Sequence, residues 1–190
     1  MRTFYLISLL AMFVMPPIAA HAREEAPLGS GTVALKVDYI VFTSNYFDSG
    51  FREDDGIYVG LEGYVAVAPN VYLGGEVGHG VNIDLVGEDI SFVPIELNVK
   101  YAAEAAPNLV MDVGIGISGN YVELQDRGPF GSGTSADDFL FGGQVFADLT
   151  YTIRWFSIGA NAKYQITEDF RDENFALDNM RVGAHIGVTF

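Results

Sequence analysis

The chain has 190 residues, of which 49% are hydrophobic, 22 are glycine and none is cysteine, and its formal net charge is −15. This length fits one domain, and the absence of cysteine excludes a small scaffold held together by disulfides. An acidic chain without a basic patch also gives no support for nucleic-acid binding.

The first 22 residues have the pattern of a cleavable signal peptide. Arg2 supplies a positive charge, an apolar stretch of 17 residues follows (FYLISLLAMFVMPPIAA), and Ala20 and Ala22 form an A-x-A cleavage site. A membrane anchor is the alternative, but this stretch is short for a span of about 20 residues, and Pro16 and Pro17 would break its helix. We therefore expect cleavage after Ala22.

Downstream of this leader, apolar and polar residues alternate with a period of two in eight segments, which indicates β-strands. The segments are Thr32–Thr43, Gly56–Ala68, Asn70–Asp84, Ile90–Ala102, Asn108–Val122, Asp138–Thr152, Trp155–Thr167 and Asn179–Phe190. They are longer than the five or six residues that are about usual in soluble sheets. They match the length of about 9–11 residues that a tilted strand needs to cross a bilayer.

The links between these segments alternate in length. The second, fourth and sixth segments are followed by short links (APN, AEAAPN and IR), whereas long polar links follow the first, fifth and seventh. The third link, LVGE, is short but acidic. Outer-membrane barrels have short periplasmic turns and longer extracellular loops. With an even number of strands, both termini then lie in the periplasm.

The position of the charges distinguishes a membrane barrel from a soluble one. Charged residues share the parity of the small and polar residues, while the opposite parity is almost purely apolar. A soluble barrel would reverse this pattern. The predicted fold is therefore an all-β, eight-stranded antiparallel up-and-down transmembrane β-barrel, preceded by a cleavable signal peptide. The inward charge network comprises Lys36, Asp38, Glu62, Glu76, Glu96, Lys100, Asp112, Asp148, Lys163, Arg181 and His185.

Outward aromatic residues are expected at both ends of the barrel, as aromatic belts at the two membrane interfaces. The periplasmic belt comprises Tyr101, Tyr151, Phe156 and Phe190, and the opposite belt comprises Tyr121, Phe139, Phe141 and Tyr164. Tyr58, Tyr64, Phe146 and Trp155 are expected to fill the interior. Two positions fit poorly: Pro94 predicts a bulge, or pairing that starts only after it. His79 faces lipid by parity.

The chain resembles the small outer-membrane β-barrels of Gram-negative bacteria, which include the OmpA membrane domain, OmpX, OmpW and the opacity-type, porin-family-like proteins. The resemblance rests on the leader, the eight alternating segments, FVPIELNVKY with PNLVMDVGIGISGNY, and the terminal AHIGVTF. It implies an outer-membrane location and a C-terminal signal, Phe190, Val188 and Ile186, for the outer-membrane assembly machinery. The expected organisation is a signal peptide at 1–22, a short periplasmic segment at 23–31 and a barrel at 32–190.

Fold alone does not give function, and three roles remain open. The first is a filled barrel with a structural or surface-interaction role, because an eight-stranded barrel is just wide enough for side chains to fill it. The second is a small passive porin-like channel lined by the surplus acids. The third, more remote, is a lipid A-modifying enzyme that uses His79 with Ser91 or Ser118. His185 faces inward, away from outer-leaflet lipid.

The expected loops are strongly acidic, with Arg52, Arg127 and Arg171 as their only bases. Their sixteen acids are Asp48, Glu53, Asp54, Asp55, Asp84, Glu88, Asp89, Glu123, Asp126, Asp137, Asp138, Glu168, Asp169, Asp172, Glu173 and Asp178. Solvated loops are the simple interpretation. The alternative is that divalent cations bridge the carboxylates to lipopolysaccharide, because hard cations prefer oxygen ligands. We expect a monomer with no catalytic residues, cofactor, resident metal or nucleic-acid partner.

Overall fold

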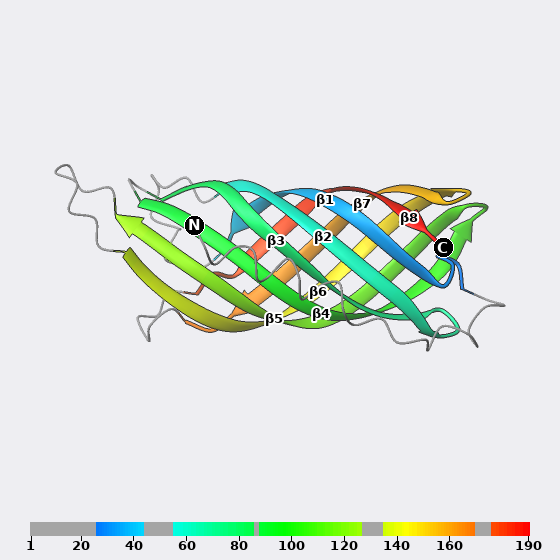
Figure 1. Cartoon of the computed structure of the whole chain (residues 1–190), viewed down its shortest axis with the longest axis horizontal. Helices are drawn as coiled ribbons and strands as arrows, with labels where there is room; N and C mark the ends of the chain where they lie inside the picture. The colour runs from blue at the N-terminus through cyan, green and yellow to red at the C-terminus, as the bar shows by residue number, and fades with distance from the viewer. Residues whose placement is uncertain (1–25, 44–54, 86–87, 127–134, 170–175) are drawn as a thin grey trace.

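A computed structural model describes residues 26–43, 55–85, 88–126, 135–169 and 176–190, and these form one closed barrel (Figure 1). Eight antiparallel strands pair in sequence order, and β1 pairs with β8 to close the sheet. The strands are β1 (Gly31–Phe42), β2 (Asp55–Ala68), β3 (Val71–Leu85), β4 (Glu88–Ala106), β5 (Leu109–Asp126), β6 (Ser135–Ile153), β7 (Phe156–Thr167) and β8 (Asn179–Thr189). The predicted eight-stranded up-and-down barrel is confirmed.

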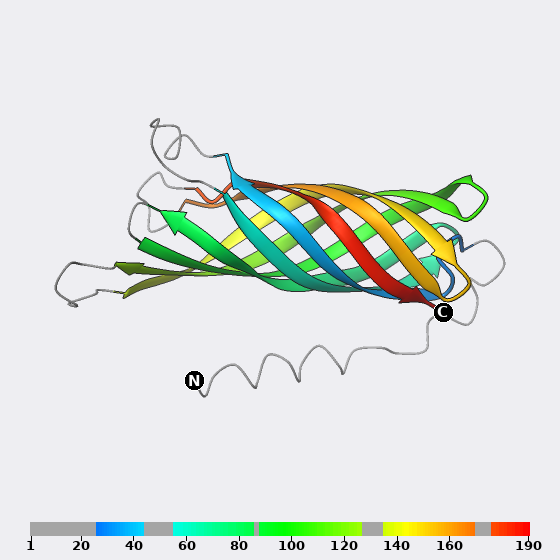
Figure 2. The same ribbon diagram turned by 90° about the horizontal axis from the view of Figure 1, so that it is seen from above.

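The barrel has a turn end, where β2, β4, β6 and β8 finish and the C-terminus lies, and an opposite loop end, where β1, β3, β5 and β7 finish (Figure 2). At the loop end β5 and β6 project beyond the other strands (Figure 1). Their ladder continues to Gln125↔Ser135. Eight of the sixteen acids expected in loops therefore lie in strands, from Asp55 in β2 to Asp138 in β6. The long links at 44–54, 127–134 and 170–175 lie outside the described residues.

Tight turns at the turn end contain left-handed residues. Asn70 (φ 61°), Asn108 (φ 63°) and Arg154 (φ 60°) are the described non-glycine residues with positive φ, and Asn is the side chain that tolerates this region best. Trp155 belongs to the last of these turns and not to β7, so its expected inward orientation is wrong. The alternation between inward and outward positions does not continue through a turn, and the Trp155 side chain is 65% exposed.

Pro94 lies within β4, so pairing does not begin after it. The β4–β5 ladder continues through Pro94↔Asn120. On the other side the β3–β4 pairs stop at Val77↔Ile95 and resume at Gly80↔Phe92, and the register shifts just beyond, before Ile83. A residue without an N–H is tolerated where the ladder is interrupted. Phe92 and Glu96 both point inward, so β4 keeps the same inner face on both sides of Pro94.

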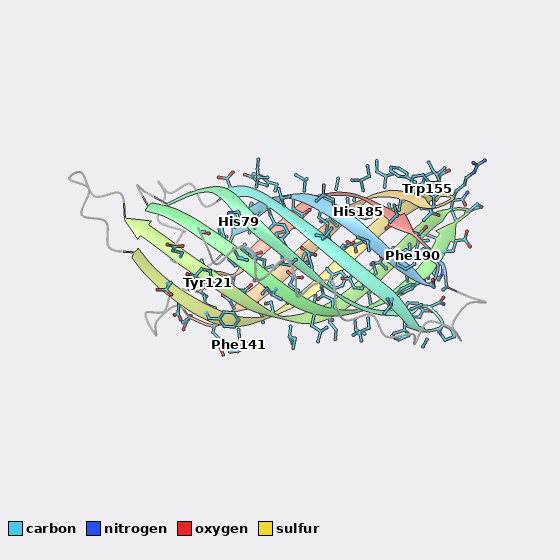
Figure 3. The ribbon with its side chains drawn as sticks, in the orientation of Figure 1. His79, Tyr121, Phe141, Trp155, His185 and Phe190 are labelled. Atoms are coloured by element: carbon cyan, nitrogen blue, oxygen red, sulfur yellow. The ribbon has the colours of Figure 1, made fainter. Side chains whose placement is uncertain are left out.

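His79 lies on the outer wall, paired with the outward Val59. Its side chain is half-buried, and its Nδ1 atom has no hydrogen-bond partner among the described residues. In Figure 3 it lies nearer the loop end than the turn end.

Residues just before β1 close the turn end of the barrel. Leu28 is 2% exposed and packs in an apolar cluster with Tyr64, Tyr72, Val110 and other interior residues. The Tyr72 hydroxyl accepts a hydrogen bond from Leu28 N (2.9 Å) and donates one to Gly29 O (3.1 Å). This part of the segment expected to be a periplasmic linker is therefore packed into the barrel.

Between the two ends of the barrel, the wall alternates between an apolar outside and a largely polar inside. On β5, for example, Met111, Ile115 and Ile117 are 54%, 62% and 66% exposed, whereas Asp112 and Asn120 are almost completely buried. No helix in the described ranges is long and apolar enough to span a membrane.

Candidate functional site

The charged residues of the interior form the candidate site, because they are the largest set of titratable groups that the fold brings together. All eleven residues of the inward network are at most 5% exposed. They come from all eight strands, and their burial places them on the inside of the closed sheet. Buried charges are tolerated only when they are paired and hydrogen-bonded.

The acidic side of the interior is a row of three glutamates on neighbouring strands. Glu62 on β2 pairs in register with Glu76 on β3, and Glu76 pairs with Glu96 on β4. Like charges directly opposite each other in a sheet are destabilising. The row therefore requires cations in contact with it.

The opposing strands supply these cations. Lys163 Nζ on β7 donates to Oε2 of Glu76 (2.7 Å) and of Glu96 (2.5 Å). Arg181 on β8 donates to Glu96 and, at 3.4 Å, to Glu76 Oε1, and its guanidinium lies 4.4 Å from the centre of the Tyr58 ring. These two cations and two carboxylates balance in charge and link opposite walls of the barrel.

A second group lies closer to the turn end. Lys36 Nζ donates to Glu62 Oε2 (3.2 Å) and lies 3.5 Å from Glu76 and 3.7 Å from Asp148. Lys100 Nζ contacts Asp112 Oδ2 (3.2 Å) and Asp148 Oδ2 (3.7 Å). Here two lysines face three carboxylates.

Asp38 and His185 make no ion pair among the described residues. Asp38 Oδ1 accepts a hydrogen bond from Asn161 Nδ2 (2.7 Å), while its Oδ2 is buried without a partner. His185 Nε2 lies 3.1 Å from Thr150 Oγ1, and its Nδ1 has no partner among the described groups.

Neutral amides complete the polar interior, and sequence reasoning did not select them. Gln144 Nε2 donates to Asn98 Oδ1 (2.7 Å), and Asn98 Nδ2 donates to Glu96 Oε2 (3.2 Å). A chain of amides follows toward the loop end, in which Asn179 donates to Gln165 and Gln165 donates to Asn120. These amides lie at inward positions of the alternating pattern, which could have identified them, but the predicted network contained charged residues only.

Apolar side chains close the interior at both ends. The loop end is closed by residues that are at most 2% exposed, and two of their rings, Phe42 and Phe92, meet edge to face with centres 6.1 Å apart. These residues are Ile40, Phe42, Phe92, Val122, Leu140 and Leu177. The cluster around Leu28 closes the turn end. The sequence analysis predicted neither closure, because it selected interior residues by their charge and these inward residues are apolar.

The aromatic residues lie on the outer surface near the two ends. At the turn end Tyr101, Tyr151 and Phe190 are 52%, 44% and 57% exposed, and Phe156 is half-buried against Trp155. Toward the loop end Tyr121, Phe139, Phe141 and Tyr164 point outward as expected, and Tyr39, which the sequence analysis did not include, is also outward and 54% exposed. Figure 3 shows Trp155 and Phe190 near one end, and Tyr121 and Phe141 toward the other.

The last strand is anchored by main-chain hydrogen bonds. Val188 and Ile186 point outward on β8 like Phe190. The Phe190 carbonyl accepts hydrogen bonds from Ser30 N (2.6 Å) and Gly31 N (3.0 Å), and Phe190 N donates to Gly31 O (3.0 Å). The C-terminus therefore helps to hold the β1–β8 seam that closes the barrel.

Among the described residues, no group of three or more His, Cys, Asp or Glu side chains has the arrangement of a metal site. Five of the six carboxylates of the inward network instead lie within 4 Å of a lysine or an arginine.

Sequence comparisons find no match: no family model fits the chain, and no curated protein is similar to it. Solved structures do match. Neisserial surface protein A superposes with a TM-score of 0.68 at 13% identity, covering 85% of this chain and 98% of that one. The chain has the fold of the small outer-membrane barrels.

Two further structures agree. The N-terminal β-barrel domain of Pseudomonas aeruginosa OprF has a TM-score of 0.56 at 12% identity over 85% of this chain and 98% of its own. Ail, the attachment invasion locus protein of Yersinia pestis, has a TM-score of 0.55 at 11% identity over 84% and 97%. At such low identity the match concerns the barrel fold alone.

Proposed function

We propose that the protein is a non-conducting outer-membrane barrel with a structural or surface-interaction role, with its loop end outside the cell and both termini in the periplasm. The observation that carries this proposal is the inverted distribution of residues: the ionised groups are buried inside, and the exposed wall is apolar. Such a wall is stable only against hydrocarbon. The signal-peptide pattern of residues 1–22 supports export, and residues 23–31 would then begin the mature chain on the periplasmic side.

Surface interaction is favoured over transport because both ends of the interior are closed. A conducting barrel needs a continuous water-filled path. The two apolar closures and the ion pairs between them leave the charged side chains of the inward network at most 5% exposed to water. The porin-like channel is therefore the weaker candidate.

The partner of the loop end is proposed to be cationic. The links and strand extensions there carry most of the acids of a chain whose net charge is −15. Ail has been solved in complex with the heparin analogue sucrose octasulfate. A polyanion of that kind would be repelled by this loop end. Lipopolysaccharide would need divalent cations as bridges.

A role as an enzyme is not part of the proposal. His79 faces outward while Ser118 is buried in the interior, so the wall of the barrel separates them. Ser91 lies beside the register shift of β3 and β4, and no hydrogen bond connects it to His79 in the described residues. We further propose that the protein is monomeric and that Ile186, Val188 and Phe190 are read by the outer-membrane assembly machinery.

Two measurements on the refolded protein test the proposal. Gel mobility with and without heating reports whether the barrel is folded, and planar-bilayer recording reports conduction by the same sample. The proposal predicts heat-modifiable mobility and no unitary current steps. Regular steps from a sample that is folded by gel mobility would overturn the non-conducting role and favour the channel.

A further inference from the structure

The interior network contains six carboxylates and four cations. One of the two excess negative charges belongs to Asp38, which makes no ion pair among the described residues, and the other lies near the turn end. Lys163 and Arg181 balance Glu76 and Glu96 through the contacts described above. Near the turn end, Lys36 and Lys100 face Glu62, Asp112 and Asp148. That group has one negative charge too many if all three carboxylates are ionised.

The excess charge of the turn-end group is concentrated where two carboxyl groups face each other. Asp112 on β5 and Asp148 on β6 are direct register partners, and both side chains point inward. They are 1% and 3% exposed, and Lys100 Nζ lies near both carboxyl groups, 3.2 Å from Asp112 Oδ2 and 3.7 Å from Asp148 Oδ2. Two carboxylates in this position would repel each other and could not form a hydrogen bond.

The pair also lacks donors. Asp112 Oδ1 and both oxygens of Asp148 receive no hydrogen bond from any described protein group. Only Asp112 Oδ2 is satisfied, by Lys100 Nζ at 3.2 Å. Almost all buried polar atoms in proteins have a hydrogen-bond partner, so three unpartnered oxygens in one pair require an explanation.

The surrounding groups do not supply the missing donor. Lys36 and Lys100 lie 3.7 Å from Asp148, beyond hydrogen-bond distance, and both also contact other carboxylates or rings. His185 on β8 is directed to Thr150 through Nε2. Glu62 on β2 adds negative charge, the Tyr72 hydroxyl on β3 donates to Gly29 O, and the inward neighbours on β7 are the uncharged Ser157 and Asn161.

We propose that Asp112 and Asp148 form an internal proton-binding site, in which the two side chains share one proton at neutral pH. The proton lies between Asp112 Oδ1 and Asp148, so that the protonated carboxyl group donates to the carboxylate. It removes the excess negative charge and satisfies two of the three unpartnered oxygens. Aspartic dyads with a shared proton follow the same rule, since like charges in close contact cannot both ionise.

The shared proton makes the barrel sensitive to alkali. An unfolded aspartate releases its proton at about pH 4, whereas the folded pair keeps one proton at neutral pH. The stability that this proton contributes is therefore complete in acid and is lost as rising pH removes it from the folded barrel. Melting temperature should decline above neutral pH in the native protein, and this decline should be smaller in Asp112→Asn, where an amide replaces the neutral acid.

Infrared spectroscopy with carboxyl-labelled aspartate tests the proposal directly. The folded native protein at pH 7 should show the carbonyl stretch of a protonated aspartic acid, shifted in D2O. The signal should disappear in Asp112→Asn and in Asp148→Asn, because either change leaves one carboxylate facing Lys100. It should remain in the control Asp38→Asn, which removes a buried carboxylate that lies outside this group.

Three results would overturn the proposal. The first is the absence of a protonated aspartic acid signal from the folded native protein at pH 7, which requires no variant to fold. The second is a signal lost in Asp38→Asn but kept in both dyad variants. The third is a melting temperature at pH 7 that rises when sodium replaces a bulky organic cation and changes little in alkali, because a bound cation would then neutralise the pair.

Discussion

Arg181 is expected to be the most important single charge of the interior, and its replacement by methionine tests the ion-pair account. Its side chain is completely buried, bonds to Glu76 and Glu96, and covers the Tyr58 ring. Removing one partner of a buried ion pair costs about 3–5 kcal/mol, because an uncompensated charge remains. Arg181→Met should therefore lower the free energy of unfolding by about that amount.

The double variant separates the energy of the Arg181–Glu96 ion pair from the energy of side-chain packing. Glu96→Gln alone should also be strongly destabilising, but in Arg181→Met with Glu96→Gln both charges are gone. The combined cost should fall short of the sum of the single costs by about 0.5–3 kcal/mol, the usual range for contacting residues. Glu168→Gln, an exposed carboxylate near the end of β7, is the control and should change stability by less than about 0.5 kcal/mol.

Urea unfolding in detergent micelles provides the measurement, analysed by linear extrapolation. Trp155 is the single tryptophan and lies exposed at the turn end, so its fluorescence reports the transition without interference from the variants. A double-variant cost that equals the sum of the two single costs within about 0.5 kcal/mol would refute the reasoning, because the two side chains would then act independently.

Three further predictions concern packing and the ends of the barrel. Gly114→Ala should cost about 1–3 kcal/mol in urea unfolding, because the added Cβ would lie 2.2 Å from Phe146 Cζ. The control Gly143→Ala should be nearly neutral, because the nearest neighbour of its Cβ would be 3.7 Å away. Equal effects of the two changes would contradict the filled interior. Leu28→Ala should cost about 2–3 kcal/mol by calorimetry, and no change in melting temperature would mean that the turn-end closure does not stabilise the barrel. Phe190→Ala keeps the main-chain hydrogen bonds, so it should lower assembly in cells more than stability in detergent; equal losses would mean that the ring is only a packing group.

The strands and their faces could be predicted because both depend on local alternation. A period of two fixes the face of every residue once one residue is placed, as Asp112 and Ile117 on β5 illustrate. Alternation fails where the environment no longer differs between the two faces. The ends of β4, β5 and β6 extend past the apolar wall, so acids such as Glu123 and Asp137 looked like loop residues although they are register partners.

The tertiary contacts of the interior could not be predicted. Parity placed Lys163 and Glu76 inside, but their pairing depends on the stagger of eight strands around the barrel, which no single segment encodes. The same holds for Leu28, which lies outside any strand and reaches the interior only because the chain folds back beside Phe190. The prediction that Trp155 points inward was wrong for a local reason, because a two-residue turn interrupts the alternation.

Cysteine accessibility along β7 in lipid bilayers tests the central claim most directly, because the native chain contains no cysteine. Single cysteines at Ile158, Ala160 and Ala162 on the outer face should react with a membrane-soluble maleimide. Cysteines at Ser157, Asn161 and Gln165 on the inner face should be protected, since these side chains are at most 4% exposed. Uniform reactivity, or the reverse alternation with labelling from the aqueous phase, would contradict a barrel with its charges inside and hydrocarbon outside.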